Sequence, residues 1–411
     1  MLLAIYLPAI LIAICDGLLI PTLPIYADGF GASVAVIGLV LAAEGIGTLI
    51  ADLPAGRIVS GMRVRDAMVL GTLILAVAVL GAGLAPNLGW LLVSRLVSGA
   101  GLAIWNISRH AFMVEATRGT NRGRAMSTLG GLTRLGGSMG PAVGGLLASA
   151  LGLRVPFMLY AAVAMATVVL LLSALPAGAR GGAAHGRLAG SHAEERAKRR
   201  AAMAGVRVTL FNAGGAQLLG QAVRTGRRVL VPLYAAQVLG LDVGVVGLIV
   251  SVSYLADMSL FYPAGLIMDR LGRKFAIVPS FVLQAVGMAL VPLTTGATGL
   301  TLAALLMGFG NGISAGTMLT LGADLAPKNA VATFVGWWRL IGDAGFVAGP
   351  LITGAVASGL GLGPSALVIG ALGAGAAAWF AFGVPETLGR PLAEPSARVA
   401  PLTGTDPGAS D

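Results

Sequence analysis

Long apolar segments alternate with short polar loops along almost the whole chain. Most of these segments reach the roughly 20 residues that an α-helix needs to cross a bilayer. Their spacing predicts twelve transmembrane helices and therefore an all-α integral membrane fold. The expected spans are residues 2–26, 33–56, 67–85, 88–114, 125–150, 155–175, 207–235, 244–267, 275–295, 298–325, 330–356 and 363–384.

Two polar segments divide the chain. Residues 177–205 are rich in glycine and then in charge, which predicts a cytoplasmic linker between two six-helix bundles, 1–176 and 206–384. Residues 385–411 are rich in Pro, Ser, Gly and Thr, a composition typical of a disordered tail. The first apolar segment has neither the basic flank nor the cleavage site of a secretory signal, so we expect it to stay as the first span.

The basic residues indicate how the chain is oriented. Loops after even-numbered spans carry most of the Lys and Arg, whereas loops after odd-numbered spans carry little beyond Arg154. Because cytoplasmic loops are enriched in these residues, the alternation predicts that both termini are cytoplasmic. The expected location is a bacterial-type inner membrane, crossed many times.

The two halves repeat one another. Pro54-Ala-Gly recurs at Pro263, an offset of 209 residues (263 − 54), and Gly140-Pro141 recurs as Gly349-Pro350 at the same offset. Parallel repeats of this kind place a substrate site near the middle of the membrane, between the halves. We therefore expect two pseudo-symmetric bundles with a cavity between them.

Composition excludes several other classes of protein. Of 411 residues, 56% are hydrophobic and 11% are charged, against roughly 25% charged in soluble domains. The net charge of +10 lies mostly in the loops, without interleaved aromatic residues, so nucleic acid is not an expected partner. A single cysteine, Cys15, excludes an internal disulfide and a cysteine-based metal cluster. We expect no metal, no cofactor and no catalytic residue.

Several motifs resemble those of the major facilitator superfamily. The loop after the eighth span, Gly265 to Lys274, reads as a complete copy of that family's loop signature, whereas its first-half counterpart has Ser60 and Gly61 in place of the Asp-Arg pair. The resemblance implies a major facilitator fold with a cytoplasmic gate in these loops. The residues expected in that gate are Gly265, Asp269, Arg270, Gly272, Arg273, Glu115 and Asp324.

Two further motifs are similar to those of the twelve-helix drug:proton antiporter branch. The fourth span contains Arg95-Leu-Val-Ser-Gly, which resembles the family's arginine motif and implies a part in proton coupling. The fifth span resembles the family's antiporter motif, and the eleventh repeats it loosely. Because glycine and proline allow close packing and bending of membrane helices, we interpret this set as a helix-packing motif: Gly136, Gly140, Pro141, Gly145, Gly345, Gly349 and Pro350.

Charges inside the spans are the candidate chemistry. An ionised group near the bilayer centre costs about 2.5–3.5 kcal/mol on insertion scales, so it should be paired or face water. We expect Asp16, Glu44 and Arg95 to couple transport to protons, while permanent ion pairs between helices are the alternative. The substrate-cavity candidates are Arg134, Arg224, Gln217, Gln221, Tyr254, Asp257, Asn311, Trp338, Arg339 and Asp343.

Some pairings among these charges are open to test. The repeat offset aligns Asp16 with Arg224, which suggests a contact across the halves, and Arg339 and Asp343 are i,i+4 neighbours. Arg227 and Arg228 are expected to extend towards the membrane interface. Arginines are at least as numerous as acids in the spans, so an anionic or zwitterionic substrate is as compatible with the sequence as a cationic drug.

A membrane-embedded enzyme is the competing class. Two stretches match the serine-hydrolase pattern G-x-S-x-G, centred on Ser138 and Ser314. That pattern needs a strand–turn–helix context and a histidine base, and both copies lie in expected membrane helices. No Walker lysine motif occurs, so ATP is not an expected energy source.

We therefore predict a secondary active transporter that works by alternating access, most simply a proton-coupled exporter of drugs or small metabolites. The alternative is a proton-coupled symporter that imports a small organic anion, and a membrane-embedded sensor or enzyme is a remote one. Its partners would be a small-molecule substrate, protons and the lipid bilayer, and we expect a monomer.

Overall fold

A computed structural model describes residues 5–116, 122–175 and 202–389. These residues form helices joined by short loops, and they contain no β-strand. Ten helical segments of the described chain are long and apolar enough to cross a membrane. The two remaining long helices, α5 and α8, are rich in arginine and complete the set of twelve.

The first bundle contains the helices α1 (Leu7–Asp28), α2 (Val34–Gly61), α3 (Val64–Gly83), α4 (Leu88–Ala116), α5 (Arg122–Leu151) and α6 (Val155–Ala174). Several of these helices carry proline inside, at Pro21, Pro24, Pro54 and Pro141. The loop between α1 and α2 ends at Ser33, whose hydroxyl accepts a hydrogen bond from the backbone of Val36 and so caps α2.

The second bundle contains α8 (Arg207–Leu233), the π-helical turn η3 (Tyr234–Val238), α9 (Val243–Ser259), α10 (Phe261–Arg270), α11 (Arg273–Leu290), the 3₁₀ turn η4 (Val291–Leu293), α12 (Ala297–Ile313), α13 (Thr317–Asp324), α14 (Val331–Leu360) and α15 (Leu362–Gly383). The pairs α9 and α10, and α12 and α13, each form one span. This arrangement confirms the predicted fold of two six-helix bundles.

The expected spans match the helices to within a few residues, but two of them are broken. The eighth span is interrupted at Leu260, between α9 and α10. The tenth is interrupted between α12 and α13, where Gly316 has a φ of +80°. Only glycine adopts such a left-handed backbone without strain, so the break is possible at that residue. Hydropathy does not reveal it, because the flanking residues stay apolar on both sides.

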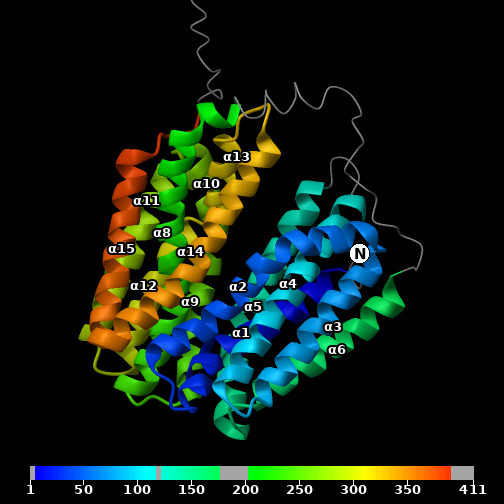
Figure 1. Cartoon of the computed structure of the whole chain (residues 1–411). Coiled ribbons are helices and arrows are strands. Elements are labelled where there is room, and N and C mark those ends of the chain that lie inside the picture. Colours follow the sequence, from blue (N-terminus) through cyan, green and yellow to red (C-terminus); the bar gives the residue numbers. More distant parts are fainter. Residues whose placement is uncertain (1–4, 117–121, 176–201, 390–411) are drawn as a thin grey trace, which may run out of the picture.

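The bundles meet at one end of the molecule and diverge towards the other (Figure 1). We call the end that holds the end of α6 and the beginning of α8 the linker end, and the opposite one the far end. At the far end, a Cβ on Gly145 would lie 2.9 Å from the Cα of Gly247, and a Cβ on Gly354 would lie 3.1 Å from the Cα of Gly38. These backbone approaches join α5 to α9 and α14 to α2.

Hydrogen bonds between the bundles also gather at the far end. Gln237 donates to the carboxylate of Asp28 over 2.8 Å, and the backbone N–H of Ala35 donates to the hydroxyl of Ser358 over 3.1 Å. We call these glycine approaches and hydrogen bonds the far-end seam. Packing at such small residues is how membrane helices come close together.

Candidate functional site

A cavity of about 540 Å3 lies between the bundles. Its walls come from α1, α2, α4 and α5 on one side and from α8, α9, α12 and α14 on the other. Its size is that of a site for a small organic molecule, for which volumes of roughly 300–1,000 Å3 are usual. Its lining includes eight ionisable side chains that the membrane would otherwise disfavour: Asp16, Glu44, Arg95, Arg134, Arg224, Arg227, Arg228 and Asp257.

Glu44 and Arg95 form an ion pair inside the first bundle, between α2 and α4. Glycine makes this pairing possible, because a Cβ on Gly99 would overlap the carbonyl oxygen of Glu44, and one on Gly47 would overlap that of Leu96. The two helices therefore pack backbone against backbone at this depth. The arginine motif of the sequence thus combines a charge with the glycine that brings it to its partner.

Asp16 lies in the same cavity, but no cation among the described residues is in ion-pair contact with it. Its carboxylate accepts a hydrogen bond from the hydroxyl of Tyr160 on α6. The contact with Arg224 suggested by the repeat offset is not formed, because Arg224 donates instead to Gln221 and to the hydroxyl of Ser314. Sequence reasoning missed Tyr160, which lies in an otherwise apolar run where only its hydroxyl could have marked it.

Arg134 and Asp257 connect the two bundles. Arg134 of α5 lies 3.5 Å from the carboxylate of Asp257 on α9. Asn311 of α12 donates to the other oxygen of that carboxylate over 3.0 Å. Among the described residues this is the one ion pair between the bundles, and it places both charges in the wall of the cavity.

Arg224, Arg227 and Arg228 all line the cavity from α8. The expectation that Arg227 and Arg228 extend to the membrane interface is wrong: Arg227 is only 8% exposed, and its guanidinium carbon lies 5.6 Å from the ring centre of Tyr254. That of Arg228 lies 5.5 Å from the ring of Phe346. Both cations therefore lie against aromatic rings that the protein supplies, Arg227 buried and Arg228 exposed in the cavity lining.

Four cavity candidates lie elsewhere, so their assignment is corrected. Gln217 donates to the backbone carbonyl of Trp338, and the indole of Trp338 donates to Met318, so both side chains belong to packing within the second bundle. Arg339 and Asp343 do form the expected i,i+4 ion pair, at 3.7 Å, but outside the cavity lining. The cavity does contain Arg134, Arg224, Gln221, Tyr254, Asp257 and Asn311.

The expected packing motif lies in close helix contacts. A Cβ on Gly136 would lie 2.8 Å from the carbonyl oxygen of Ile10 on α1, and Gly140 meets Gly17 of the same helix. Their repeat equivalents, Gly345 and Gly349, pack α14 against α8 in the same way. Pro141 and Pro350 each follow one of these glycines. The carbonyl oxygen of Pro141 packs against Gly247 of the opposite bundle, and that of Pro350 packs against Gly38.

The serine-hydrolase pattern has a structural explanation. Ser138 donates to the carbonyl of Leu135 within α5. Ser314 lies at the end of α12, where its hydroxyl accepts from Arg224 and contacts Ser280. Neither serine has the strand–turn–helix surroundings of a nucleophile, since the described residues contain no strand.

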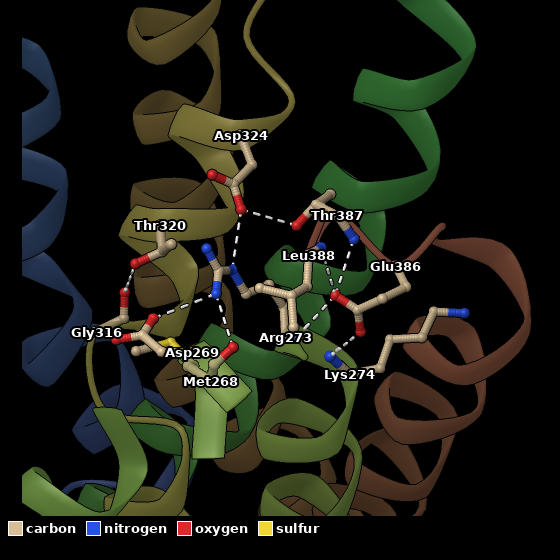
Figure 2. A network of polar contacts seen from close by, with 10 residues as sticks. All are labelled: Met268, Asp269, Arg273, Lys274, Gly316, Thr320, Asp324, Glu386, Thr387 and Leu388. Carbon is tan, nitrogen blue, oxygen red and sulfur yellow. Dashed lines mark hydrogen bonds and ion pairs between the residues drawn. The ribbon is translucent and has the colours of Figure 1, made fainter. Parts of the chain in front are cut away.

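A polar network joins the ends of several helices at the linker end of the second bundle (Figure 2). Arg273 lies 3.0 Å from the carboxylate of Asp324 and 3.4 Å from that of Asp269, and it donates to the carbonyl of Met268. Gly272 has a φ of +120°, which favours glycine at this turn into α11. Arg270 is exposed, and the side chain of Glu115 lies outside the described residues.

Glu386 completes this network from the other end of the chain. Its carboxylate accepts hydrogen bonds from the backbone N–H groups of Arg273 and Lys274, which begin α11, and Thr387 donates to Asp324. Disorder was expected from Pro385 onward, yet Glu386 and Thr387 are held in place. An acid directly after the last span was the available signal, because unpaired N–H groups at a helix start attract carboxylates.

Burial and hydrogen bonding act on Glu386 in opposite directions. Partial burial raises the pKa of the carboxyl, but hydrogen bonds from the backbone of Leu388, Lys274, Arg273 and Thr387 outweigh it. The net effect is a pKa below the ordinary value for glutamate, so the carboxylate is ionised at neutral pH.

Among the residues that the structure describes, which exclude 117–121, 176–201 and the side chain of Glu115, the first bundle shows no equivalent of this network. Where Asp269 and Arg270 stand in the second half, the first has Ser60 and Gly61. Arg65 donates instead to the carbonyl of Leu175 over 3.1 Å and approaches its neighbour Asp66. The described contacts of the two loops therefore differ, as their sequences do.

A family model described as Major Facilitator Superfamily matches residues 5–220 and, in a second match, residues 215–405. The chain belongs to the major facilitator superfamily. It is accordingly a membrane transporter for small molecules and not an enzyme.

This major facilitator protein is similar to bacterial drug-efflux proteins. It is 23% identical over 345 residues to the multi-drug resistance efflux pump PmrA homolog of Lactococcus lactis, across 83% of this chain and 84% of that protein. It is 29% identical over 153 residues to multidrug resistance protein 2 of Bacillus subtilis. That match spans 37% of this chain and only 38% of the Bacillus protein.

Solved structures of the superfamily share its fold. A bacterial homologue of the human lysosomal transporter Spinster, in an inward-facing and unoccupied conformation, superposes with a TM-score of 0.75 at 16% identity, over 92% of this chain and 95% of that one. The nucleoside transporter NupG also gives 0.75, at 14% identity, over 92% and 98% of the two chains. At such low identity these likenesses carry the fold alone.

Proposed function

We propose that this major facilitator protein exports small molecules by alternating access in exchange for protons. The observation that carries the proposal is a cavity between two bundles that touch at the far end and diverge at the linker end, with three acids in its wall. The bias of basic loops supports a cytoplasmic linker end. The cavity then faces the cytoplasm in this conformation.

Transport in this proposal requires the bundles to rock. Opening the far end separates Gly145 from Gly247 and Gly38 from Gly354, while the linker ends approach one another. The far-end seam contains no ion pair among the described residues, so it parts without breaking a salt bridge, and the carboxylate of Asp28 exchanges its hydrogen bond with Gln237 for water. Arg134 and Asp257, which do pair across the bundles, mark the depth at which the two walls stay in contact.

Protons would bind at Asp16 or Glu44. Both carboxylates line the cavity, so water that enters it from either side brings protons to them. Protonation of Glu44 would remove the charge that holds Arg95, and protonation of Asp16 would change its hydrogen bond with Tyr160. Each event alters the charge that a substrate meets in the cavity, which is what coupling requires.

The names of the efflux relatives support export, since two proteins similar to this chain are described as multidrug resistance or efflux proteins. One observation favours the alternative of importing an organic anion together with protons: the cavity holds more arginines than acids. The two functions differ in the direction of substrate movement relative to the proton gradient.

Flux into vesicles tests the proposal. The purified protein in liposomes is given a pH gradient of either sign, with ethidium and naphthalene-2-sulfonate as cationic and anionic probes. An antiporter accumulates a probe when the vesicle interior is acidic, whereas a symporter accumulates it when the exterior is acidic. Accumulation that ignores both gradients would refute proton coupling.

The acids are tested in the same assay. We expect Asp16→Asn or Glu44→Gln to lower gradient-driven accumulation at least tenfold while exchange of probe without a gradient continues. The matched control is Asp66→Asn, an equal change of charge on α3 outside the cavity lining. Full gradient-driven activity in both cavity variants would exclude Asp16 and Glu44 as proton carriers.

A further inference from the structure

Helix α8 brings three guanidinium groups into the cavity. We call Arg224, Arg227 and Arg228 the arginine cluster. Arg227 and Arg228 follow Arg224 by three and four residues, so both lie next to it on the helix surface. Within the described chain none of them has an acid in ion-pair contact. A group of unpaired cations in a membrane cavity is costly and requires an explanation.

Neutral groups occupy only part of the cluster's hydrogen-bonding capacity. Arg224 donates to Gln221 over 3.2 Å and to Ser314 over 2.6 Å, but its Nε has no partner. The Nη1 of Arg227 is buried without a partner, and so is the hydroxyl of Tyr254 beside it. A guanidinium carries five N–H donors and no acceptor, so these free donors need an acceptor that the described residues do not supply.

The acids of the cavity are engaged elsewhere. Glu44 is paired with Arg95, and Asp257 with Arg134 and Asn311. Asp16 accepts from Tyr160 and contacts no arginine. With all three acids ionised, five arginines less three acids leave two positive charges in the cavity lining. That surplus belongs to the arginine cluster.

Apolar side chains of the first bundle line the same cavity, next to its acids. They are Leu19, Ile20 and Leu23 of α1, Leu41 of α2 and Leu102 of α4, and we call these five residues the leucine-rich wall. A second cavity of about 20 Å3 lies beside Arg227 and Arg228, bounded also by Tyr254 and Ser253. Ile20 and other apolar side chains line it as well, and its volume is enough for about one water molecule, so Arg227 and Arg228 have room for a water beside them in addition to the main cavity.

We propose that the cargo is an amphiphilic organic anion, with its charged group on the arginine cluster and its apolar body against the leucine-rich wall. This inference rests on the proposed transport function and names the substrate class of the same cavity. Carboxylate, sulfonate and phosphate oxygens match the guanidinium fork and accept two hydrogen bonds from it. A lipophilic cation would meet the surplus positive charge and leave the free donors unpartnered.

Binding of three probes of one shape tests the charge of the cargo. Isothermal titration of the full chain in phosphatidylcholine nanodiscs compares naphthalene-2-sulfonate, naphthalene-2-sulfonamide and 2-naphthyltrimethylammonium, which are an anion, a neutral molecule and a cation. We expect the sulfonate to bind at least tenfold more tightly than the other two. Equal or tighter binding of the cation would overturn the proposal.

Variants locate the anion. Arg224→Gln and Arg228→Gln should each weaken sulfonate binding at least tenfold and leave sulfonamide binding within twofold, because only the anion uses the guanidinium. Arg207→Gln is the matched control, since it removes the same charge from the exposed beginning of the same helix. An Arg224→Lys variant keeps the charge but loses the fork, and it should bind the sulfonate more weakly than the wild type.

A further arm identifies the source of the anion, and the assay separates the two proposals. Decanoate, which enters the bilayer, should outcompete the sulfonate if the cargo is drawn from the membrane, and it should be the weaker ligand if the cargo comes from water. Binding needs no proton gradient. Preferred sulfonate binding without gradient-driven flux would therefore refute the transport mechanism alone, whereas gradient-driven flux of the cation with no sulfonate binding would refute the anion alone.

Discussion

Two acids share one cavity but are held by different neighbours. Glu44 contacts the guanidinium of Arg95, which is 8% exposed, so removing Glu44 leaves a buried cation without its partner. Loss of one member of a buried ion pair costs about 3–5 kcal/mol. Asp16 contacts only the neutral hydroxyl of Tyr160, and its removal strands no charge. Asp16→Asn is therefore the clearer probe of proton coupling, and Glu44→Gln needs a stability measurement beside it.

Glu386 is a residue whose stabilising effect should depend on pH. Its folded-state pKa lies below the ordinary value, so its contribution is complete above pH 4.5 and is lost as the pH falls through the lower folded-state value. Because its carboxylate caps the beginning of α11, we expect Glu386→Gln to lower stability at pH 7 by about 1 kcal/mol. Thermal unfolding of the detergent-purified protein measures the change.

The same comparison in acid provides the check on Glu386. Below the ordinary glutamate value of 4.5 the unfolded chain takes up a proton at Glu386 more readily than the folded chain, so the difference in unfolding temperature between wild type and Glu386→Gln should shrink as the pH falls. A difference that stays constant from pH 7 to pH 3.5 would mean that the charge of Glu386 does not contribute.

At the scale of the helix, close packing decides where charges lie. Gly99 allows α4 to pack directly on the backbone of α2, and this contact sets the distance between Arg95 and Glu44. Gly140 and Gly349 do the same for the contacts of α1 with α5 and of α8 with α14. Glycine contacts thus set the distances between the helix backbones that carry the side chains of the site.

Gly99→Ala tests that argument. The new methyl group would overlap the carbonyl of Glu44, so we expect a loss of about 1–3 kcal/mol in stability together with weaker gradient-driven flux. Gly130→Ala in α5 is the control, because a Cβ there meets no atom within 4 Å. It should leave stability unchanged or slightly improved. Equal losses in both variants would show that packing at Gly99 is not special.

The sequence predicted the helices better than their interruptions or their side-chain partners. Long apolar runs specify spans because a bilayer demands them, and the repeat offset located the paired glycine–proline motifs correctly. The sequence did not predict the hydrogen bond from Arg224 to Ser314 or the packing of Arg227 on the ring of Tyr254. Both contacts depend on how the helices are rotated relative to one another. The assignment of Trp338 to the cavity failed for the same reason.

At the scale of the whole molecule, the far-end seam is the feature that any rocking motion must open. Asp28 and Gln237 hydrogen-bond across it over 2.8 Å. With the buried Cys15 replaced by alanine, we expect the pair Asp28→Cys and Gln237→Cys to be joined by a short thiol cross-linker. Cross-linked protein should lose at least nine-tenths of its flux in vesicles and regain it on cleavage of a reducible linker.

The control for the seam is each cysteine alone, treated with the same reagent, which should keep its flux. Full flux through fully cross-linked protein would contradict alternating access, because the far end would then be closed permanently. The contacts at the linker end bear on the same motion. The second bundle carries the network around Arg273, and in the described part of the first bundle Arg65 contacts Leu175 and Asp66.

The position of Glu386 decides where the chain can be truncated or fused to another protein without loss of stability. A stop codon or a fusion junction placed after Gly389 preserves the carboxylate that caps α11 and the threonine that reaches Asp324. A junction placed only a few codons earlier, at the apparent end of the last hydrophobic stretch, removes both. Protein that ends before Glu386 should therefore unfold at a lower temperature than protein that ends after Gly389, although both contain every membrane helix.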